Sequence, residues 1–104
     1  MNLLFVLLGC GVRYLLNSRV DTAVQFAREC NASQIDWFLS GGIKNPLEDT
    51  VTEAEKMAYQ ISQYEQQHNI TINNWNYIYD TVATNTAENF IMVKQYLDET
   101  PIDY

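Results

Sequence analysis

Small and polar residues follow three apolar segments of this chain, and they are of types that can bind anions or transfer protons. In chain order they are Gly9, Gly11, Arg19, Ser40, Gly41, Gly42, Glu53, Asn85, Thr86, Glu88 and Asn89. Glycines let backbone N–H groups approach an anion closely, and helix N-termini favour negative charge. Arg19 can add a bidentate contact to a phosphate or carboxylate. Glu53 and Glu88 are the candidate catalytic acid–base groups, and the other residues are candidate ligand contacts.

The same residues also have structural interpretations, which the sequence leaves open. Gly41 and Gly42 are typical of a chain turn, and Glu53 and Glu88 would favour helix dipoles. Asn85 and Thr86 are ordinary helix caps.

Other common site patterns are missing from the sequence. One histidine, His68, and scattered carboxylates predict no metal site. Tyr14 stands where a dinucleotide-binding motif would need its third glycine, and Ser40 lacks the glycine-flanked elbow of a hydrolase nucleophile.

Three apolar runs predict strands: residues 3–8, 35–39 and 74–80. The first run, within "LLFVLLGCGV", also resembles an export signal that ends in a lipid-anchored cysteine, Cys10. However, only two residues precede the run, the first basic residue is Arg13, and six apolar residues are far fewer than the ~20 that span a bilayer. We therefore interpret it as a buried parallel strand and expect a cytoplasmic protein without a membrane span.

Helical periodicity separates these runs. Ser18 and Asp21 are predicted to begin a helix, whose apolar stripe is Val20, Ala23, Val24 and Ala27. A capping box from Thr52 to Glu55 predicts a second helix with the stripe Ala54, Met57, Ala58, Ile61 and Tyr64. A third stripe comprises Phe90, Val93, Tyr96 and Leu97.

The resulting order is βαβαβα, which predicts an α/β fold with a three-layer, Rossmann-like parallel sheet. In such sheets ligands bind beyond the carboxyl ends of the strands, where the polar residues of this chain gather.

Composition limits the classes of partner. The 104 residues are 47% apolar and 18% charged, with a net charge of −7 and six Lys and Arg, which favours one globular domain at residues 1–104. Without a basic run, nucleic acid is not an expected partner. Cys10 and Cys30 are interpreted as unbridged thiols, and a single disulfide is the alternative.

Five motifs together resemble the SanA/ElyC/YdcF-like domain of unknown function: "LLGCGV", "RVDTAVQFA", "FLSGG", "TEAEKM" and "DTVATNTAEN". Their order and spacing match that family over about residues 3 to 95. Arg19 and Ala23, Ser40 to Gly42, Glu53 to Glu55, and Asn85, Thr86, Glu88 and Asn89 stand at its motif positions. The resemblance implies a Rossmann-like fold and a nucleotide-like or phosphate-bearing ligand, with S-adenosylmethionine-like molecules included. It does not decide whether the chain is an enzyme.

The chain also departs from that family. Cys10 replaces a glycine, and family members continue with a further strand where this chain ends. We therefore expect either a partial domain or a reduced member that completes its sheet by self-association. Exposed aromatic surface is expected from Trp37, Trp75 and Tyr77 to Tyr79. The alternative to ligand binding is a non-catalytic module that acts through a homo-oligomer or a partner protein.

Overall fold

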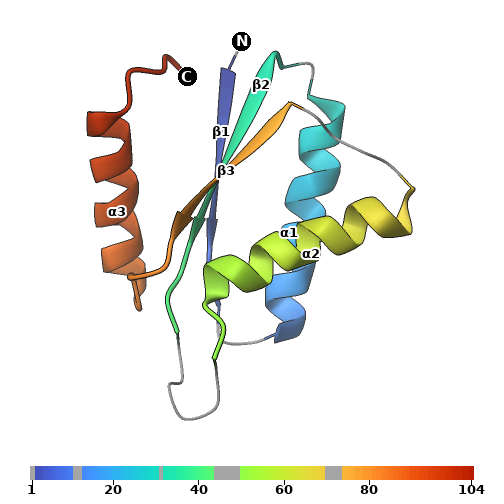
Figure 1. The fold of residues 1–104 in the computed structure, drawn as a ribbon, viewed down its shortest axis with the longest axis horizontal. Helices are drawn as coiled ribbons and strands as arrows, with labels where there is room; N and C mark the ends of the chain where they lie inside the picture. Colours follow the sequence, from blue (N-terminus) through green and yellow to red (C-terminus); the bar gives the residue numbers. More distant parts are fainter. Residues whose placement is uncertain (1, 11–12, 31, 44–49, 70–73) are drawn as a thin grey trace.

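The fold is a three-stranded parallel sheet with helices on both faces (Figure 1). The computed structural model describes residues 2–10, 13–30, 32–43, 50–69 and 74–104. Its elements are β1 (Asn2–Leu8), α1 (Arg13–Glu29), β2 (Gln34–Ser40), α2 (Glu53–Gln67), β3 (Trp75–Asp80) and α3 (Thr86–Glu99). The βαβαβα order and the α/β class predicted from the sequence are confirmed.

The middle strand of the sheet is β2, which pairs in parallel with β1 on one side and β3 on the other. In this register Leu8, Ser40 and Asp80 lie side by side at the carboxyl edge. The glycine and serine motifs that follow β1 and β2 are therefore brought to one edge of the sheet.

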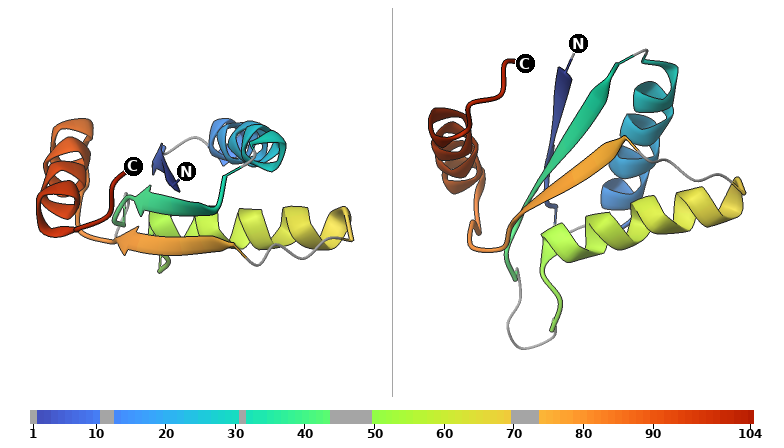
Figure 2. Two further views of the ribbon diagram at one scale, coloured as in Figure 1. Left: turned by 90° about the horizontal axis from the view of Figure 1, so that it is seen from above. Right: turned by 45° about the horizontal axis from the view of Figure 1, so that its top comes forward.

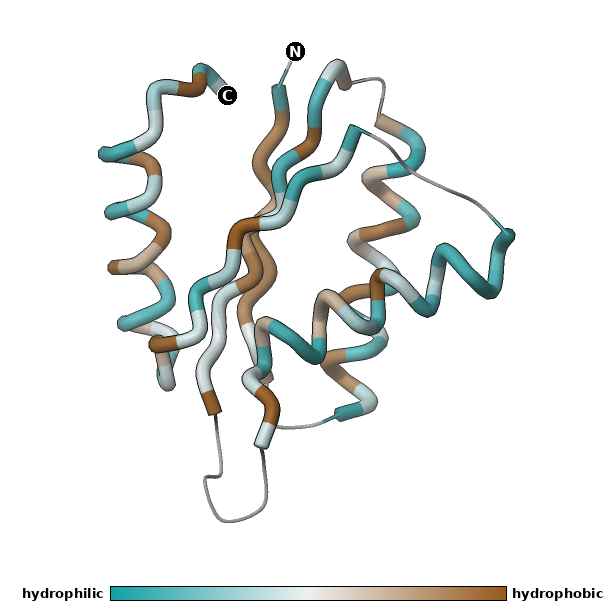
Figure 3. The backbone as a smooth tube through the Cα atoms, viewed as in Figure 1, coloured by the Kyte–Doolittle hydropathy of each residue, from teal (hydrophilic) through white to brown (hydrophobic). Residues whose placement is uncertain are grey.

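The main core lies between the sheet and helices α1 and α2. Alternate strand residues such as Leu7, Trp37 and Trp75 point into it, and the Trp37 and Trp75 rings lie 5.0 Å apart. The expectation that both tryptophans are exposed is wrong, because their exposed fractions are 0% and 8%. Figure 3 shows a continuous apolar run along β1, whereas the far end of α2 is polar.

Helix α3 covers the opposite face of the sheet (Figure 2). Phe38 of β2 contacts Tyr96 there, with 5.3 Å between the ring centroids. The predicted stripe is only half right: Val93 and Tyr96 are half-buried, but Phe90 and Leu97 are 60% and 45% exposed. The helix is rotated relative to the prediction because it is anchored to the sheet by a buried polar residue, Asn89.

Helix α1 begins earlier than the predicted cap pair. It starts at Arg13, five residues before Ser18, because Leu16 adds another turn to the buried stripe of Val20, Val24 and Ala27. Arg19 consequently lies within the helix rather than at its start.

Helix α2 begins as the sequence predicts. Thr52 is the N-cap, and its hydroxyl accepts a hydrogen bond from the Glu55 amide at 3.2 Å. The carboxylate of Glu55 contacts the Thr52 amide in return, which completes the capping box. The buried residues Ala54, Met57, Ile61 and Tyr64 form the predicted stripe.

Two expectations from the composition bear on the fold. Cys10 and Cys30 are both half-buried and form no disulfide with each other. In the described part of the chain, every helix is too short or too polar to cross a membrane.

Candidate functional site

Three glycines hold the carboxyl edge of the sheet together through their backbone amides. The Gly9 amide donates to the Ser40 carbonyl at 2.8 Å, Gly41 to that of Asp80 at 2.8 Å, and Gly42 to that of Ala83 at 2.6 Å. Because each N–H group already has a carbonyl acceptor, an anion at this edge must draw its hydrogen bonds mainly from side chains. Gly11, another candidate, lies outside the described residues.

The same glycines allow three backbone segments to come unusually close. A Cβ atom at Gly9 or Gly41 would lie 2.6 Å from the Cβ of Glu53, and one at Gly42 would lie 2.9 Å from the Thr81 carbonyl oxygen. The start of α2 is also bonded to this loop, since the amides of Glu53 and Ala54 donate to the carbonyls of Gly42 and Gly41 at 3.0 Å. The glycines therefore fix the position of Glu53.

Glu53 is buried, with only 2% of its surface exposed. Its Oε1 lies 3.5 Å from Nζ of Lys56, one turn further along α2. Its Oε2 is buried and has no hydrogen-bond partner among the described residues. A buried carboxylate oxygen without a donor is costly and therefore rare, so this atom marks the edge of the sheet as a candidate site.

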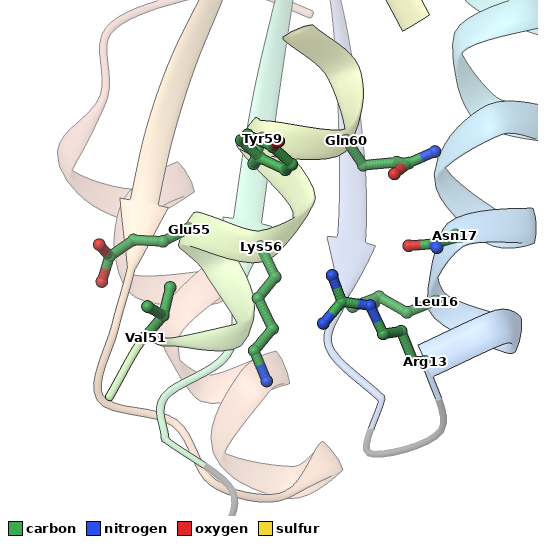
Figure 4. A pocket seen from close by; sticks show the side chains of 8 residues that line it. All are labelled: Arg13, Leu16, Asn17, Val51, Glu55, Lys56, Tyr59 and Gln60. Carbon is green, nitrogen blue, oxygen red and sulfur yellow. The ribbon is translucent and has the colours of Figure 1, made fainter. Parts of the chain in front are cut away.

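A cavity of about 410 Å³ opens between α1 and α2 beside this carboxylate. Its lining residues are Arg13, Leu16, Asn17, Val51, Glu55, Lys56, Tyr59 and Gln60. Figure 4 shows Arg13 and Lys56 extending from the two helices into the space between them, whereas Glu55 points away. The cavity therefore presents two cations, and Glu55, the acidic residue among those that line it, is turned away from them.

A second, smaller cavity of about 30 Å³ adjoins the first. Cys10, Arg13, Leu16, Glu53 and Lys56 line it, and three of these residues also line the larger cavity. Among the sequence-predicted site residues that the structure describes, Glu53 is thus the only one that lines either of these two spaces.

Ser40 and Asn89 belong to a separate polar cluster on the α3 face of the sheet. Ser40 Oγ lies 2.6 Å from Asp80 Oδ2 and 2.9 Å from the side-chain oxygen of Asn89. Asp80 Oδ1 accepts hydrogen bonds from the amides of Val82 and Ala83. All three side chains are buried, so the cluster joins β2, β3 and α3.

The remaining candidates near α3 act as helix caps in the structure. Asn85 is the N-cap, and its Oδ1 accepts from the Glu88 amide at 2.9 Å. Glu88 Oε1 accepts from the amide and the hydroxyl of Thr84, and Thr86 is the first helical residue. Glu88 lies in the first turn of α3, and Glu53 is the first residue of α2. These two helices cover opposite faces of the sheet (Figure 2), so the two carboxylates do not form a pair.

Arg19 faces a different part of the surface. Its guanidinium donates a hydrogen bond to the Leu8 carbonyl at the end of β1, and its side chain lines an open groove between α1 and β1. It is therefore not among the residues of the α1–α2 cavity. The candidate contacts that the sequence yields thus divide among three places.

The cations of the cavity, Arg13 and Lys56, were not among the residues singled out by sequence motifs. Leu16 is in register with the apolar stripe of α1, so the stripe could have indicated that the helix starts near Arg13. A helix start that follows β1 lies at the carboxyl edge of the sheet, which is where Arg13 would then be expected. Lys56 follows Glu53 by three residues, which on a helix places both side chains on one face.

The described residues contain no group of three or more His, Cys, Asp or Glu side chains that could hold a metal ion. Comparison with protein-family models, with curated proteins and with solved structures finds no match to this chain.

Proposed function

We propose that this chain binds a small phosphate-bearing ligand, such as a nucleoside monophosphate, in the cavity between α1 and α2. The observation that carries the proposal is the pair of cations, Arg13 and Lys56, which line one cavity at the carboxyl edge of a parallel sheet. This edge is where ligands of open α/β sheets bind. The volume of about 410 Å³ lies within the usual range for small-molecule sites.

The chemistry of the lining supports a nucleotide-like ligand. Arg13 and Lys56 suit a phosphate, with Arg13 able to form a bidentate contact. Tyr59, whose side chain is 62% exposed, offers an aromatic surface on which a base can stack. Asn17 and Gln60 add neutral donors and acceptors on the two facing helices. S-adenosylmethionine carries a sulfonium cation where a nucleotide has phosphate, and it suits this pair of cations less well.

Arg19→Ala provides a matched control for the test, because Arg19 is a second arginine of α1 that lies outside the cavity. The experiment measures binding of AMP by calorimetry and by thermal shift in wild type, Arg13→Ala, Lys56→Ala and Arg19→Ala. Loss of a charge-assisted contact is expected to weaken binding about tenfold or more in the first two variants. A saturating ligand at 100 times its dissociation constant adds ~2.7 kcal/mol of stability.

The pattern of losses decides where the ligand binds. Retained binding in Arg13→Ala together with loss in Arg19→Ala would move the site to the groove beside β1, as the sequence motifs suggest. Absence of any stabilisation by AMP or other phosphates in the wild type would contradict the proposal.

A second candidate function is self-association through β1. Among the described residues, β1 pairs only with β2, so its other edge is an open template for a further strand. The groove beside it has about 590 Å³ and is lined mainly by apolar side chains, including Phe5, Leu15 and Phe26. Asn2–Leu8 contains no charged residue, so a second copy of β1 meets no charge repulsion within the strand. Such pairing would make the chain a homo-oligomeric module.

A further inference from the structure

The oxygen of Glu53 that has no partner among the described residues belongs to a side chain whose stem is fixed in position. The stem of Glu53 is held between Gly9 and Gly41, and the capping box and two backbone hydrogen bonds fix the start of the helix. The carboxylate is therefore held in place before any ligand arrives, which reduces the entropy lost on binding.

The small cavity beside Glu53 has room for one polar group. Its volume of about 30 Å³ corresponds to roughly one water molecule or one ligand hydroxyl. Because Arg13, Leu16 and Lys56 line both cavities, a ligand whose anionic group lies against the two cations can extend a neighbouring group towards Glu53.

The chemistry of that neighbouring group follows from the residues around it. An ionised carboxylate only accepts hydrogen bonds, so the group must be a donor. An ammonium group would be repelled by Arg13 and Lys56, which line the same small cavity, whereas a neutral hydroxyl would not.

We infer that Glu53 accepts a hydrogen bond from a hydroxyl of the bound phosphate compound, and that the ligand class is therefore a polyol or sugar phosphate, including the ribose phosphate of a nucleotide. This inference rests on the proposed phosphate site. It assigns Glu53 to recognition of the ligand, with Lys56 held between the Glu53 carboxylate and the phosphate.

The test compares two phosphate monoesters of similar size, glycerol 3-phosphate with two hydroxyls and propyl phosphate with none. Calorimetric titration of the full 104-residue chain should show about tenfold tighter binding of glycerol 3-phosphate, as expected for one charge-assisted hydrogen bond. In Glu53→Gln, which keeps the shape of the side chain, the ratio of the two affinities should fall towards one. Binding of propyl phosphate should change much less.

Each outcome separates the two proposals. Equal binding of both esters by the wild type overturns the role of Glu53 but leaves the phosphate site intact. Absence of binding of either ester overturns the phosphate site itself. If Glu53→Gln does not fold, the ratio of the two affinities in the wild type still tests the inference. The comparison is then repeated with Glu53→Ala, which retains the Cβ packed against the glycines. An unchanged ratio in a folded variant overturns the inference.

Discussion

Gly41 and Glu53 lie so close together that a Cβ atom at position 41 would be 2.6 Å from the Cβ of Glu53. The contact joins the loop after β2 to the first turn of α2. Because the clashing atom is the Cβ of Glu53, rotation of the Glu53 side chain cannot relieve the clash.

Gly41→Ala is expected to destabilise the fold by about 1–3 kcal/mol, the usual cost of an overpacked site. Glu53→Gly removes the opposing Cβ, so the double variant should recover part of this loss. Chemical denaturation of the four proteins gives the coupling free energy, expected within about 0.5–3 kcal/mol for residues in contact. Strictly additive effects would show that the two residues do not compete for the same space.

Ser40→Ala tests whether the serine of the Ser-Gly-Gly motif is structural. It would leave Asp80 Oδ2 and the Asn89 side chain without their contact to Ser40 Oγ. Loss of a buried partner costs about 1–3 kcal/mol, to be measured by urea denaturation. Ser62→Ala, at an exposed position of α2, is the control and should change stability little. Normal stability of Ser40→Ala would instead favour a role in ligand contact.

Asp36 should make the fold sensitive to acid. Burial raises the pKa of this carboxyl, but hydrogen bonds from Tyr104, Gln34 and Asn76 lower it, and the net pKa lies below the usual 3.8. A lowered folded-state pKa contributes stability that is present above the unfolded value and is lost as pH falls through the folded value. We therefore expect the free energy of unfolding to decline below about pH 4.

Two variants isolate this effect of pH. Asp36→Asn carries no titrating group at this position. Its free energy of unfolding should therefore depend less steeply on pH between about pH 5 and pH 2. Tyr104→Phe removes the hydrogen bond of 2.6 Å to Asp36 Oδ2, so it should also reduce the pH dependence of the free energy of unfolding. Tyr79→Phe, at an exposed position of β3, is the control. An identical slope in wild type and Asp36→Asn would assign the acid sensitivity to other carboxylates.

Self-association through β1 predicts a specific strand pairing. In an antiparallel pair centred on Phe5, the middle residue of Asn2–Leu8, Leu3 faces Leu7 and Leu4 faces Val6 of the second copy. Sedimentation velocity at micromolar concentration should then detect a dimer. Val6→Lys, a charge placed on the strand edge, should shift the protein to monomer. A wild-type monomer with a sharp, cooperative melt would show that the three-stranded unit is self-sufficient.

The sequence by itself determined the order of elements and most of the core. Six continuous apolar residues before Gly9 and the helical stripes of α1 and α2 are local patterns, and burial against a parallel sheet requires them. The capping box of Thr52 and Glu55 likewise depends on residues three apart, so it could be predicted without knowledge of the fold.

Only the tertiary structure decided which polar residues share a site. Arg19, Glu53 and Glu88 each follow a different strand. Glu88 is separated from the other two because α3 packs on the opposite face of the sheet, whereas Arg19 is separated from Glu53 because its guanidinium turns to the Leu8 carbonyl at the end of β1. The outward rotation of Phe90 on α3 depends on Asn89 reaching Ser40, 49 residues away in sequence. The cavity of Arg13 and Lys56 likewise forms only where α1 and α2 pack side by side, because its walls come from two helices that no local sequence pattern connects.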